Sequence, residues 1–307
     1  MKIAIIGAGG IGGYFGGRLA AAGQNVHYVV RSRTLAVLRE RGLTIESPVT
    51  PLHLPSVQAT DDPASIGPAD VVMFAVKLPD AQEAAKLLPA LIGPNTVVIP
   101  FQNGVESAQI LAQTLPREKI ASGIAYIPAA LREPGVVIHG GAFAKLRFGA
   151  LDPAQGPALQ AFAQACQTSG IDGDVVADIK RETWEKFVFL VGLSAMTAVT
   201  RKPIGVIRVD ADMRETLQAV MLETFTVGQA EGAGLPTDFV ANRMAFVDTL
   251  PETMQASMLH DLQAGKPLEL PWLSGAVVRL AHRHGISTPV NRTIVAALKP
   301  YIQGNNT

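Results

Sequence analysis

The feature that most constrains the fold of this chain is a run of glycines directly after its first apolar segment. Residues 2–6, Lys-Ile-Ala-Ile-Ile, are typical of a short buried strand, and the glycines that follow have the spacing G-x-G-x-x-G. An apolar helical pattern begins inside the motif, and strand, glycine turn and helix together form the context of a dinucleotide-binding fingerprint. A glycine-rich turn without a ligand is the alternative. The predicted cofactor contacts in the motif are Gly7, Gly9, Gly10, Ile11 and Gly12.

Each spaced glycine has a separate physical purpose in such a motif. Gly7 permits the tight turn, Gly9 removes a side chain that would block a pyrophosphate, and Gly12 lets helix and strand pack closely. The N-terminus of the helix then offers N–H groups and a partial positive charge to the phosphates.

Beyond the motif, the chain divides into two regions of different periodicity. Strand-like segments alternate with helical segments as far as residue 148, whereas only helical periodicity is found from residue 178 onward. The alternation predicts a doubly wound, Rossmann-type α/β sheet. We therefore expect a cofactor-binding domain over residues 1–175 and an all-α domain, for substrate binding and dimerisation, over residues 176–307.

The expected elements follow from the same patterns. We predict strands over 25–30, 70–76, 96–100, 120–127, 135–139 and 145–148, with short edge strands within 42–58. We predict helices over 34–41, 79–91, 105–115, 178–200, 212–231, 237–250, 258–264 and 270–284.

Composition excludes several classes of partner. The 26 Lys and Arg residues balance the 26 Asp and Glu residues, so neither nucleic acid nor an anionic membrane is an expected partner. No apolar run reaches the length of a membrane span. Cys166 is the single cysteine, which rules out an internal disulfide and, with no signal-peptide pattern, favours the cytoplasm. His282 and His284 do not share a helix face, so no metal site is expected.

The end of the second predicted strand indicates which dinucleotide binds. NAD-specific folds place an acid there, about 20 residues past the fingerprint, to hold the ribose 2′-hydroxyl. Here the strand ends in Val-Val-Arg-Ser-Arg, with Arg31 and Arg33 in place of the acid. Guanidinium groups suit a 2′-phosphate, which predicts NADP(H); solvated surface charges are the alternative.

Three polar residues stand in contexts that suggest chemistry. Asn103 lies just past an apolar strand, at the sheet edge where ligands bind, although an asparagine before glycine is also a common turn. Lys186 begins a strongly apolar helical stretch, and Glu269 precedes another helix. A solvated lysine and an acid that merely complements a helix dipole are the alternative interpretations.

Taken in order and spacing, these fragments resemble the ketopantoate reductase (2-dehydropantoate 2-reductase) family over essentially the whole chain. The fragments are the fingerprint, Arg31, Val76-Lys77, Gln102-Asn103-Gly104, Trp184-Glu185-Lys186, Ser257-Met258, Asp261, Gly265, Glu269 and residues 285–291.

The resemblance implies NADPH-dependent reduction of a 2-oxo acid held between the two domains, as in the conversion of ketopantoate to pantoate in pantothenate biosynthesis. It implies that Lys186 polarises the C2 carbonyl and acts as general acid. Glu269 would bind a substrate hydroxyl, and Asn103 would place substrate and lysine near the nicotinamide. Ser257 would contact the substrate carboxylate, and Lys77 would line the cleft.

The chain departs from the family where substrate is expected. Leu190 and Ser194 stand where the family usually has asparagines four and eight residues after the lysine, and Met254 replaces a third asparagine. Loss of amide donors predicts a more apolar 2-oxo or 2-hydroxy acid than ketopantoate, or relaxed specificity.

The sequence leaves two other classes of protein open and suggests an assembly state. A non-catalytic NADP(H)-binding sensor would not need Lys186 and Glu269, and a β-hydroxyacid dehydrogenase would normally carry an asparagine at position 190. The apolar run Val188–Val199 suggests a homodimer.

Overall fold

The structure, a computed structural model, describes residues 1–304 and contains two compact units. The first comprises Met1–Gln102 and Ser107–Ile179, and the second comprises Asn103–Glu106 and the chain from Lys180 onward. The division therefore follows Ile179 rather than residue 175, and a four-residue segment that carries Asn103 belongs to the second unit. Residues 305–307, which the expected second domain includes, lie outside the described residues.

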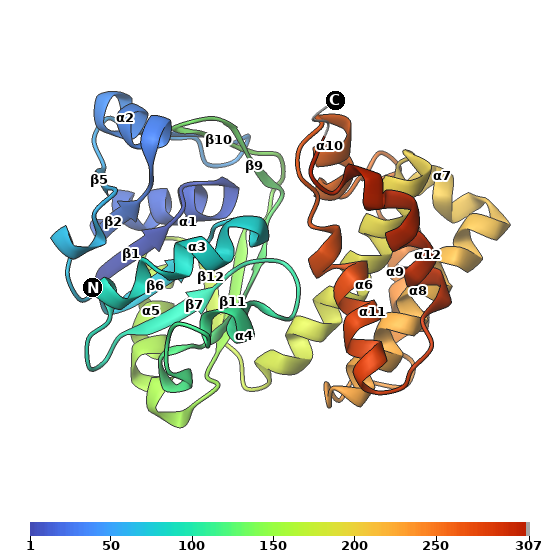
Figure 1. The fold of residues 1–307 in the computed structure, drawn as a ribbon. Helices are drawn as coiled ribbons and strands as arrows, with labels where there is room; N and C mark the ends of the chain where they lie inside the picture. The colour runs from blue at the N-terminus through green and yellow to red at the C-terminus, as the bar shows by residue number, and fades with distance from the viewer. Residues whose placement is uncertain (305–307) are drawn as a thin grey trace. The chain divides into compact units, whose positions relative to one another are not determined.

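A five-stranded sheet with the order β5-β2-β1-β6-β7 forms the centre of the first unit (Figure 1). All four neighbouring pairs in it are parallel. The chain moves outward from β1 in both directions, as in doubly wound dinucleotide-binding folds, which confirms the predicted Rossmann-type class. The five strands are β1 (Lys2–Ile6), β2 (Asn25–Val29), β5 (Gln58–Thr60), β6 (Val71–Phe74) and β7 (Val97–Pro100).

Two smaller sheets accompany this one, with the orders β4-β3-β10-β9 and β12-β11-β8. Of the edge strands expected within 42–58, only β5 lies at the edge of the central sheet, because β4 pairs with β3 and β3 pairs with β10. The sequence patterns did not predict β9 or β12. The strands of these sheets are β3 (Leu43–Glu46), β4 (Leu52–Leu54), β8 (Ser122–Tyr126), β9 (Ala129–Glu133), β10 (Val136–His139), β11 (Lys145–Gly149) and β12 (Asp172–Val175).

Side chains that alternate along β1 enter two different cores. Ile3 and Ile5 pack with Phe15 of α1 (Gly10–Ala21), whereas Ala4 and Ile6 belong to the core that includes residues of α3 and α4. The central sheet is thus covered by helices on both faces, which explains why β6 and β7 are apolar throughout. The other helices of this unit are α2 (Ser32–Arg41), α3 (Ala81–Ala85), α4 (Ser107–Leu111) and α5 (Gly156–Thr168).

The helices expected over 79–91 and 105–115 are shorter than predicted. Short 3-10 turns at Leu78–Asp80 and Leu88–Leu91 flank α3, and each has a proline near its start. Proline lacks the N–H that a continuing α-helix needs, so α3 is confined to five residues.

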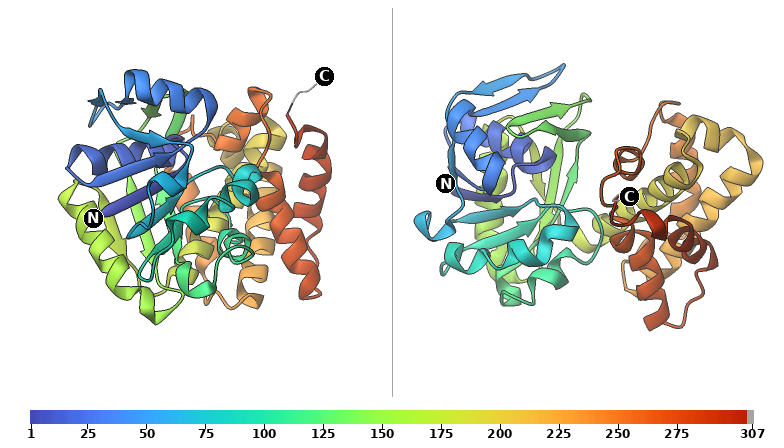
Figure 2. Two further views of the ribbon diagram at one scale, coloured as in Figure 1. Left: turned by 60° about the vertical axis from the view of Figure 1, so that its left-hand side comes forward. Right: turned by 45° about the horizontal axis from the view of Figure 1, so that its top comes forward.

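Within the described residues the second unit is built from helices alone (Figures 1 and 2), as predicted. Its helices are α6 (Ile179–Thr200), α7 (Ile204–Val209), α8 (Ala211–Ala230), α9 (Phe239–Thr249), α10 (Ser257–Gln263), α11 (Ser274–Arg283) and α12 (Pro289–Leu298). Among the helices of residues 1–304, none combines the length and apolar character that crossing a bilayer demands.

The apolar run of α6 packs within its own unit instead of forming the surface for association that the sequence suggested. Most of Val188–Val199 is buried in the core of its own unit, alongside residues of α8 and α9. A side chain that is buried within one chain is not available to a second copy. The run therefore gives no support to the homodimer that it suggested.

Candidate active site

The glycine motif lies at the carboxyl end of β1, and its three spaced glycines meet different surroundings. Gly7 has a φ of +96°, in the left-handed region that favours glycine. A Cβ on Gly12 would collide with the carbonyl oxygen of Gly7, whereas a Cβ on Gly9 would meet nothing within 4 Å. Gly12 therefore serves close packing, and Gly9 faces open space. Binding of a pyrophosphate requires both properties, close packing of helix on strand and a position without a side chain beside the phosphates.

Helix α1 begins inside the motif, with Gly9 as its N-cap. No side chain caps this end, and its first turn contains no acidic residue. The N–H groups of a first helical turn have no partner within the helix, and their dipoles attract anions. Gly10 and Ile11 form the start of this turn. A Cβ on residue 10 would collide with the backbone of Ala129, so only glycine fits there without a shift. The residues present thus fit a dinucleotide phosphate.

Two further predicted cofactor residues follow neighbouring strands of the same sheet. Arg31 is exposed just past β2, and Lys77 is exposed just past β6. Carboxyl ends of parallel strands form one edge of a sheet, so both side chains begin at the edge that carries the glycine motif.

The sequence patterns assigned no role to Gln102, the residue before Asn103. Its side-chain Nε2 donates to the carbonyl of Val76 at 2.9 Å, and its Oε1 is buried without a hydrogen-bond partner in the described structure. Its place after a buried strand, next to Asn103, was the signal that could have drawn notice.

In the second unit, three residues far apart in the sequence meet through hydrogen bonds. Lys186, on α6, donates from Nζ to Oδ1 of Asn103 at 3.0 Å. Asn103 in turn donates from Nδ2 to Oε2 of Glu269 at 3.4 Å. We call Lys186, Asn103 and Glu269 the lysine network. The amide of Asn103 is oriented by both neighbours, because its oxygen faces a donor and its nitrogen faces an acceptor.

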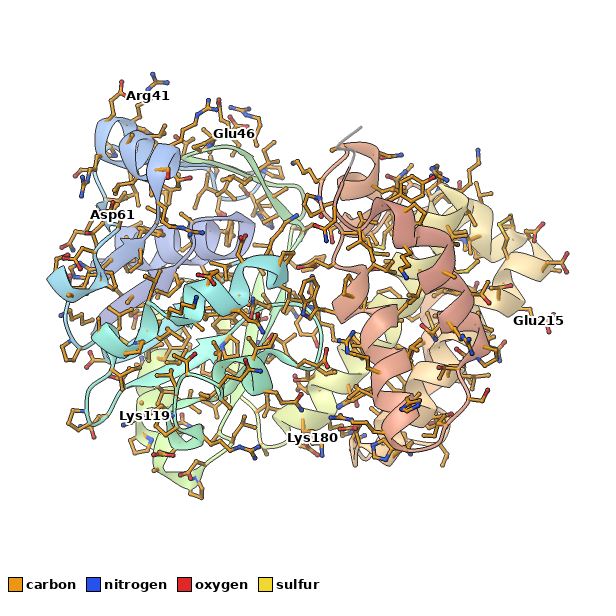
Figure 3. All side chains as sticks on the ribbon, in the orientation of Figure 1. Arg41, Glu46, Asp61, Lys119, Lys180 and Glu215 are labelled. Atoms are coloured by element: carbon orange, nitrogen blue, oxygen red, sulfur yellow. The ribbon has the colours of Figure 1, made fainter. Side chains whose placement is uncertain are left out.

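The environment of Lys186 changes its acidity. Lys180, at the start of the same helix, is exposed on the surface (Figure 3), whereas Lys186 is partly buried. Burial lowers the pKa of Lys186 to about 8, and the nearby Glu269 carboxylate opposes this change. An ammonium group with this pKa is mainly protonated at neutral pH and gives up its proton far more readily than an ordinary lysine.

The four remaining predicted substrate residues are placed in the second unit but in unlike surroundings. Leu190 and Met254 are partly buried against the helical core. Ser194 is 1% exposed, and its Oγ has no hydrogen-bond partner within residues 1–304. Ser257 is exposed as the first residue of α10. Leu190 and Ser194 follow Lys186 by about one and two turns of α6, on a shared side of the helix.

Residues 1–304 contain no group of three or more His, Cys, Asp or Glu side chains that could hold a metal ion. Cys166 is buried, and burial raises the pKa of its thiol to about 12. A thiol in that state is a poor nucleophile at neutral pH.

Comparison with known proteins agrees with this architecture in both units. The family model described as ketopantoate reductase PanE/ApbA matches residues 3–153, and the model of its C-terminal domain matches residues 178–302. A 2-dehydropantoate 2-reductase of Caulobacter vibrioides is 31% identical over 298 residues, which cover 97% of this chain and 98% of that protein. The uncharacterized oxidoreductase YkpB of Bacillus subtilis is 29% identical over 306 residues, 98% of this chain and 99% of that protein.

Solved structures extend the similarity. The crystal structure of 2-dehydropantoate 2-reductase from Geobacter metallireducens has a TM-score of 0.90 and 28% identity, covering 98% of this chain and 99% of that one. A D-mandelate dehydrogenase, solved with NADH and anilino(oxo)acetate, has a TM-score of 0.89 and 20% identity, with 98% of both chains covered; at this identity the likeness concerns the fold. This chain therefore belongs to the ketopantoate reductase family and is an oxidoreductase of the class that acts on CH–OH donors.

Proposed function

We propose that this protein is an NADPH-dependent reductase of a 2-oxo acid, with Lys186 as its general acid. The lysine network is the observation that carries the proposal, because it combines a lysine of lowered pKa with two residues that orient it. A protein that only sensed NADP(H) would have no need for a partly buried, hydrogen-bonded lysine.

The residues of the network would act in sequence on the substrate carbonyl. An ammonium group carries three N–H donors, so Lys186 is able to donate to the C2 oxygen while it also donates to Asn103. As negative charge develops on that oxygen, Lys186 would transfer its proton and become neutral. Asn103 would hold the lysine in line during this step, and Glu269 would orient Asn103 and accept a hydrogen bond from a substrate hydroxyl.

The first unit would hold the cofactor through the glycine motif, the start of α1 and Lys77. A bound nicotinamide supplies the hydride for the reduction. Arg31, just past β2 where NAD-specific folds place an acid, supports NADP(H) because its guanidinium suits a 2′-phosphate. Arg33, also exposed beyond β2, would add to this attraction.

Ketopantoate, and with it a step of pantothenate biosynthesis, is the first substrate candidate on grounds of family. Leu190 and Met254 favour a second, a more apolar 2-oxo acid, because they offer apolar surface where a polar substrate would need hydrogen bonds. A polar group left unpaired there would cost about 1–3 kcal/mol.

The test is the oxidation of NADPH by the purified protein with a panel of 2-oxo acids. The panel holds ketopantoate, branched aliphatic acids and aromatic acids. Turnover of any member supports the reductase. A kcat/KM for ketopantoate well above that of all other members would refute the apolar substrate, and inactivity with the whole panel despite tight NADPH binding would favour the sensor.

Two coarser expectations complete the proposal. A cytoplasmic location suits a chain whose single cysteine, Cys166, is a buried free thiol. A homodimer would draw on apolar side chains that the second unit leaves exposed, among them Val206 and Val209 of α7 and Phe246 of α9. Light scattering at several protein concentrations tests the dimer.

A further inference from the structure

The segment that carries Asn103 is held to the second unit by more than the lysine network. Val105 packs against the helical core of that unit. Glu106, whose side chain is 18% exposed, accepts a hydrogen bond on Oε2 from Nη2 of Arg279 at 2.6 Å. The segment of four residues thus has one apolar anchor and one short ion pair.

Arg279, on α11, also contacts the segment that carries Glu269. Its Nη1 donates to the backbone carbonyl of Pro271 at 2.7 Å. Pro271 lies in the 3-10 turn Leu270–Trp272, and the N–H groups of Trp272 and Leu273 donate to the carbonyl of Glu269 at 2.9 and 3.2 Å. One guanidinium therefore joins the backbone around Glu269 to the segment of Asn103.

The direct bond between Asn103 and Glu269 is too long to do this by itself. At 3.4 Å it lies beyond the usual range for N–H···O bonds, whereas both bonds of Arg279 are short. A planar guanidinium that donates in two directions fixes the distance between its acceptors, which a single point charge such as lysine does not.

We propose that Arg279 and Glu106 are positioning residues that set the distance between Asn103 and Glu269 and thereby the direction of the Lys186 ammonium. The inference rests on the proposed catalytic role of the lysine network. Neither residue is expected to touch the substrate. Their proposed effect on the Lys186 ammonium passes through Asn103, so without Asn103 their loss should have no further effect on proton donation by Lys186.

The chain offers a matched control pair in the same unit. Arg214 of α8 binds Asp248 of α9 through two hydrogen bonds of 2.6 and 2.9 Å. Like Arg279, Arg214 joins two elements by a partly exposed guanidinium. Its hydrogen bonds go to Arg208 and Asp248 and not to the lysine network, so Arg214→Gln reproduces the loss of an ion pair without the proposed loss of positioning.

The kinetic experiment compares Arg279→Gln with the wild type at saturating NADPH, alone and in an Asn103→Ala background. We expect kcat to fall by about tenfold to a hundredfold, the scale of a misplacement of roughly 1 Å, with KM nearly unchanged. In the Asn103→Ala background the same substitution should have almost no further effect. Arg214→Gln should leave kcat at the wild-type level. An equal loss of kcat in both backgrounds would overturn the inference.

A crystallographic readout separates this inference from the reductase proposal. In Arg279→Gln, the contact between Asn103 Nδ2 and Glu269 Oε2 should be lost, and in Arg214→Gln it should remain. Retention of the contact in Arg279→Gln would refute the positioning role whatever the activity. A wild type that reduces no 2-oxo acid would refute the reductase while the crystal structures still decide how Asn103 is held.

Discussion

Replacement of Glu269 by glutamine tests how the lysine network controls proton donation. Glutamine keeps an oxygen that accepts from Asn103 and removes only the negative charge. Burial lowers the pKa of Lys186 to about 8, and the Glu269 carboxylate acts against that change. Removal of the carboxylate must therefore lower the pKa of Lys186 further. Because a general acid has to be protonated, activity in Glu269→Gln should be lost at a lower pH than in the wild type.

The size of the effect follows from the geometry. A single amide separates the two charges, with hydrogen bonds of 3.0 and 3.4 Å on its two sides. Two unit charges ~6 Å apart at an effective dielectric constant of ~20 attract by about 2.8 kcal/mol, equivalent to about two pH units. Both residues are only partly buried, so water reduces this attraction. We expect the alkaline limb to move by about one pH unit.

The assay is the pH dependence of kcat/KM between pH 6 and 10 with NADPH and the best substrate of the panel. The wild type should lose activity with an apparent pKa near the value of about 8 that burial gives Lys186. Glu215, exposed on α8 (Figure 3), provides the control, since Glu215→Gln removes a charge of the same sign from the surface. An alkaline limb that stays in place in Glu269→Gln, or moves to higher pH, would refute the reasoning.

Three further predictions concern the cofactor and the substrate. Gly12→Ala should lower the free energy of unfolding of the first unit by about 1–3 kcal/mol, because the added Cβ overlaps the Gly7 carbonyl. Gly9→Ala should keep the thermal midpoint and weaken NADPH binding. Calorimetry measures both effects, and equal stability losses in the two variants would contradict the separate roles of these glycines. Arg31→Ala should reduce the ratio of kcat/KM for NADPH over NADH by about tenfold to a hundredfold, and an unchanged ratio would exclude contact with the 2′-phosphate. The double variant Leu190→Asn, Met254→Asn should raise kcat/KM for ketopantoate by about tenfold, and a decrease would show that these positions do not select substrate.

Most of the central sheet was predictable because β1, β6 and β7 are largely apolar on both faces and alternate with helices. β9 and β12 were not, since their residues, such as the Asp172-Gly173-Asp174 run, have no apolar alternation. Ladder pairing with β10 and β11 holds them, and such pairing depends on residues distant in the sequence. Helix α7 is short and consists mainly of β-branched residues, Ile-Gly-Val-Ile-Arg-Val, which by themselves do not favour a helix. Its helical form therefore depends on packing against neighbouring elements.

The candidate site was predictable in its residue types and less so in its contacts. Asn103, Lys186 and Glu269 could be proposed from motif order, but the hydrogen bonds between them depend on how three segments meet in the second unit. The ion pair of Glu106 and Arg279 spans 173 residues and has no local signal at all. The apolar run of α6 suggested a surface for a second copy, but it is buried within its own unit. An apolar stretch looks the same in sequence whether its own fold or a second copy covers it.

The central claim is that Lys186 donates the proton in an NADPH-dependent reduction. The most direct measurement is the single-turnover rate of NADPH oxidation at pH 7 in the wild type and in Lys186→Ala, with the best 2-oxo acid of the panel. The account predicts a rate lower by about a hundredfold to ten-thousandfold in Lys186→Ala, with NADPH affinity unchanged. A Lys186→Ala protein that oxidises NADPH at the wild-type rate would contradict it.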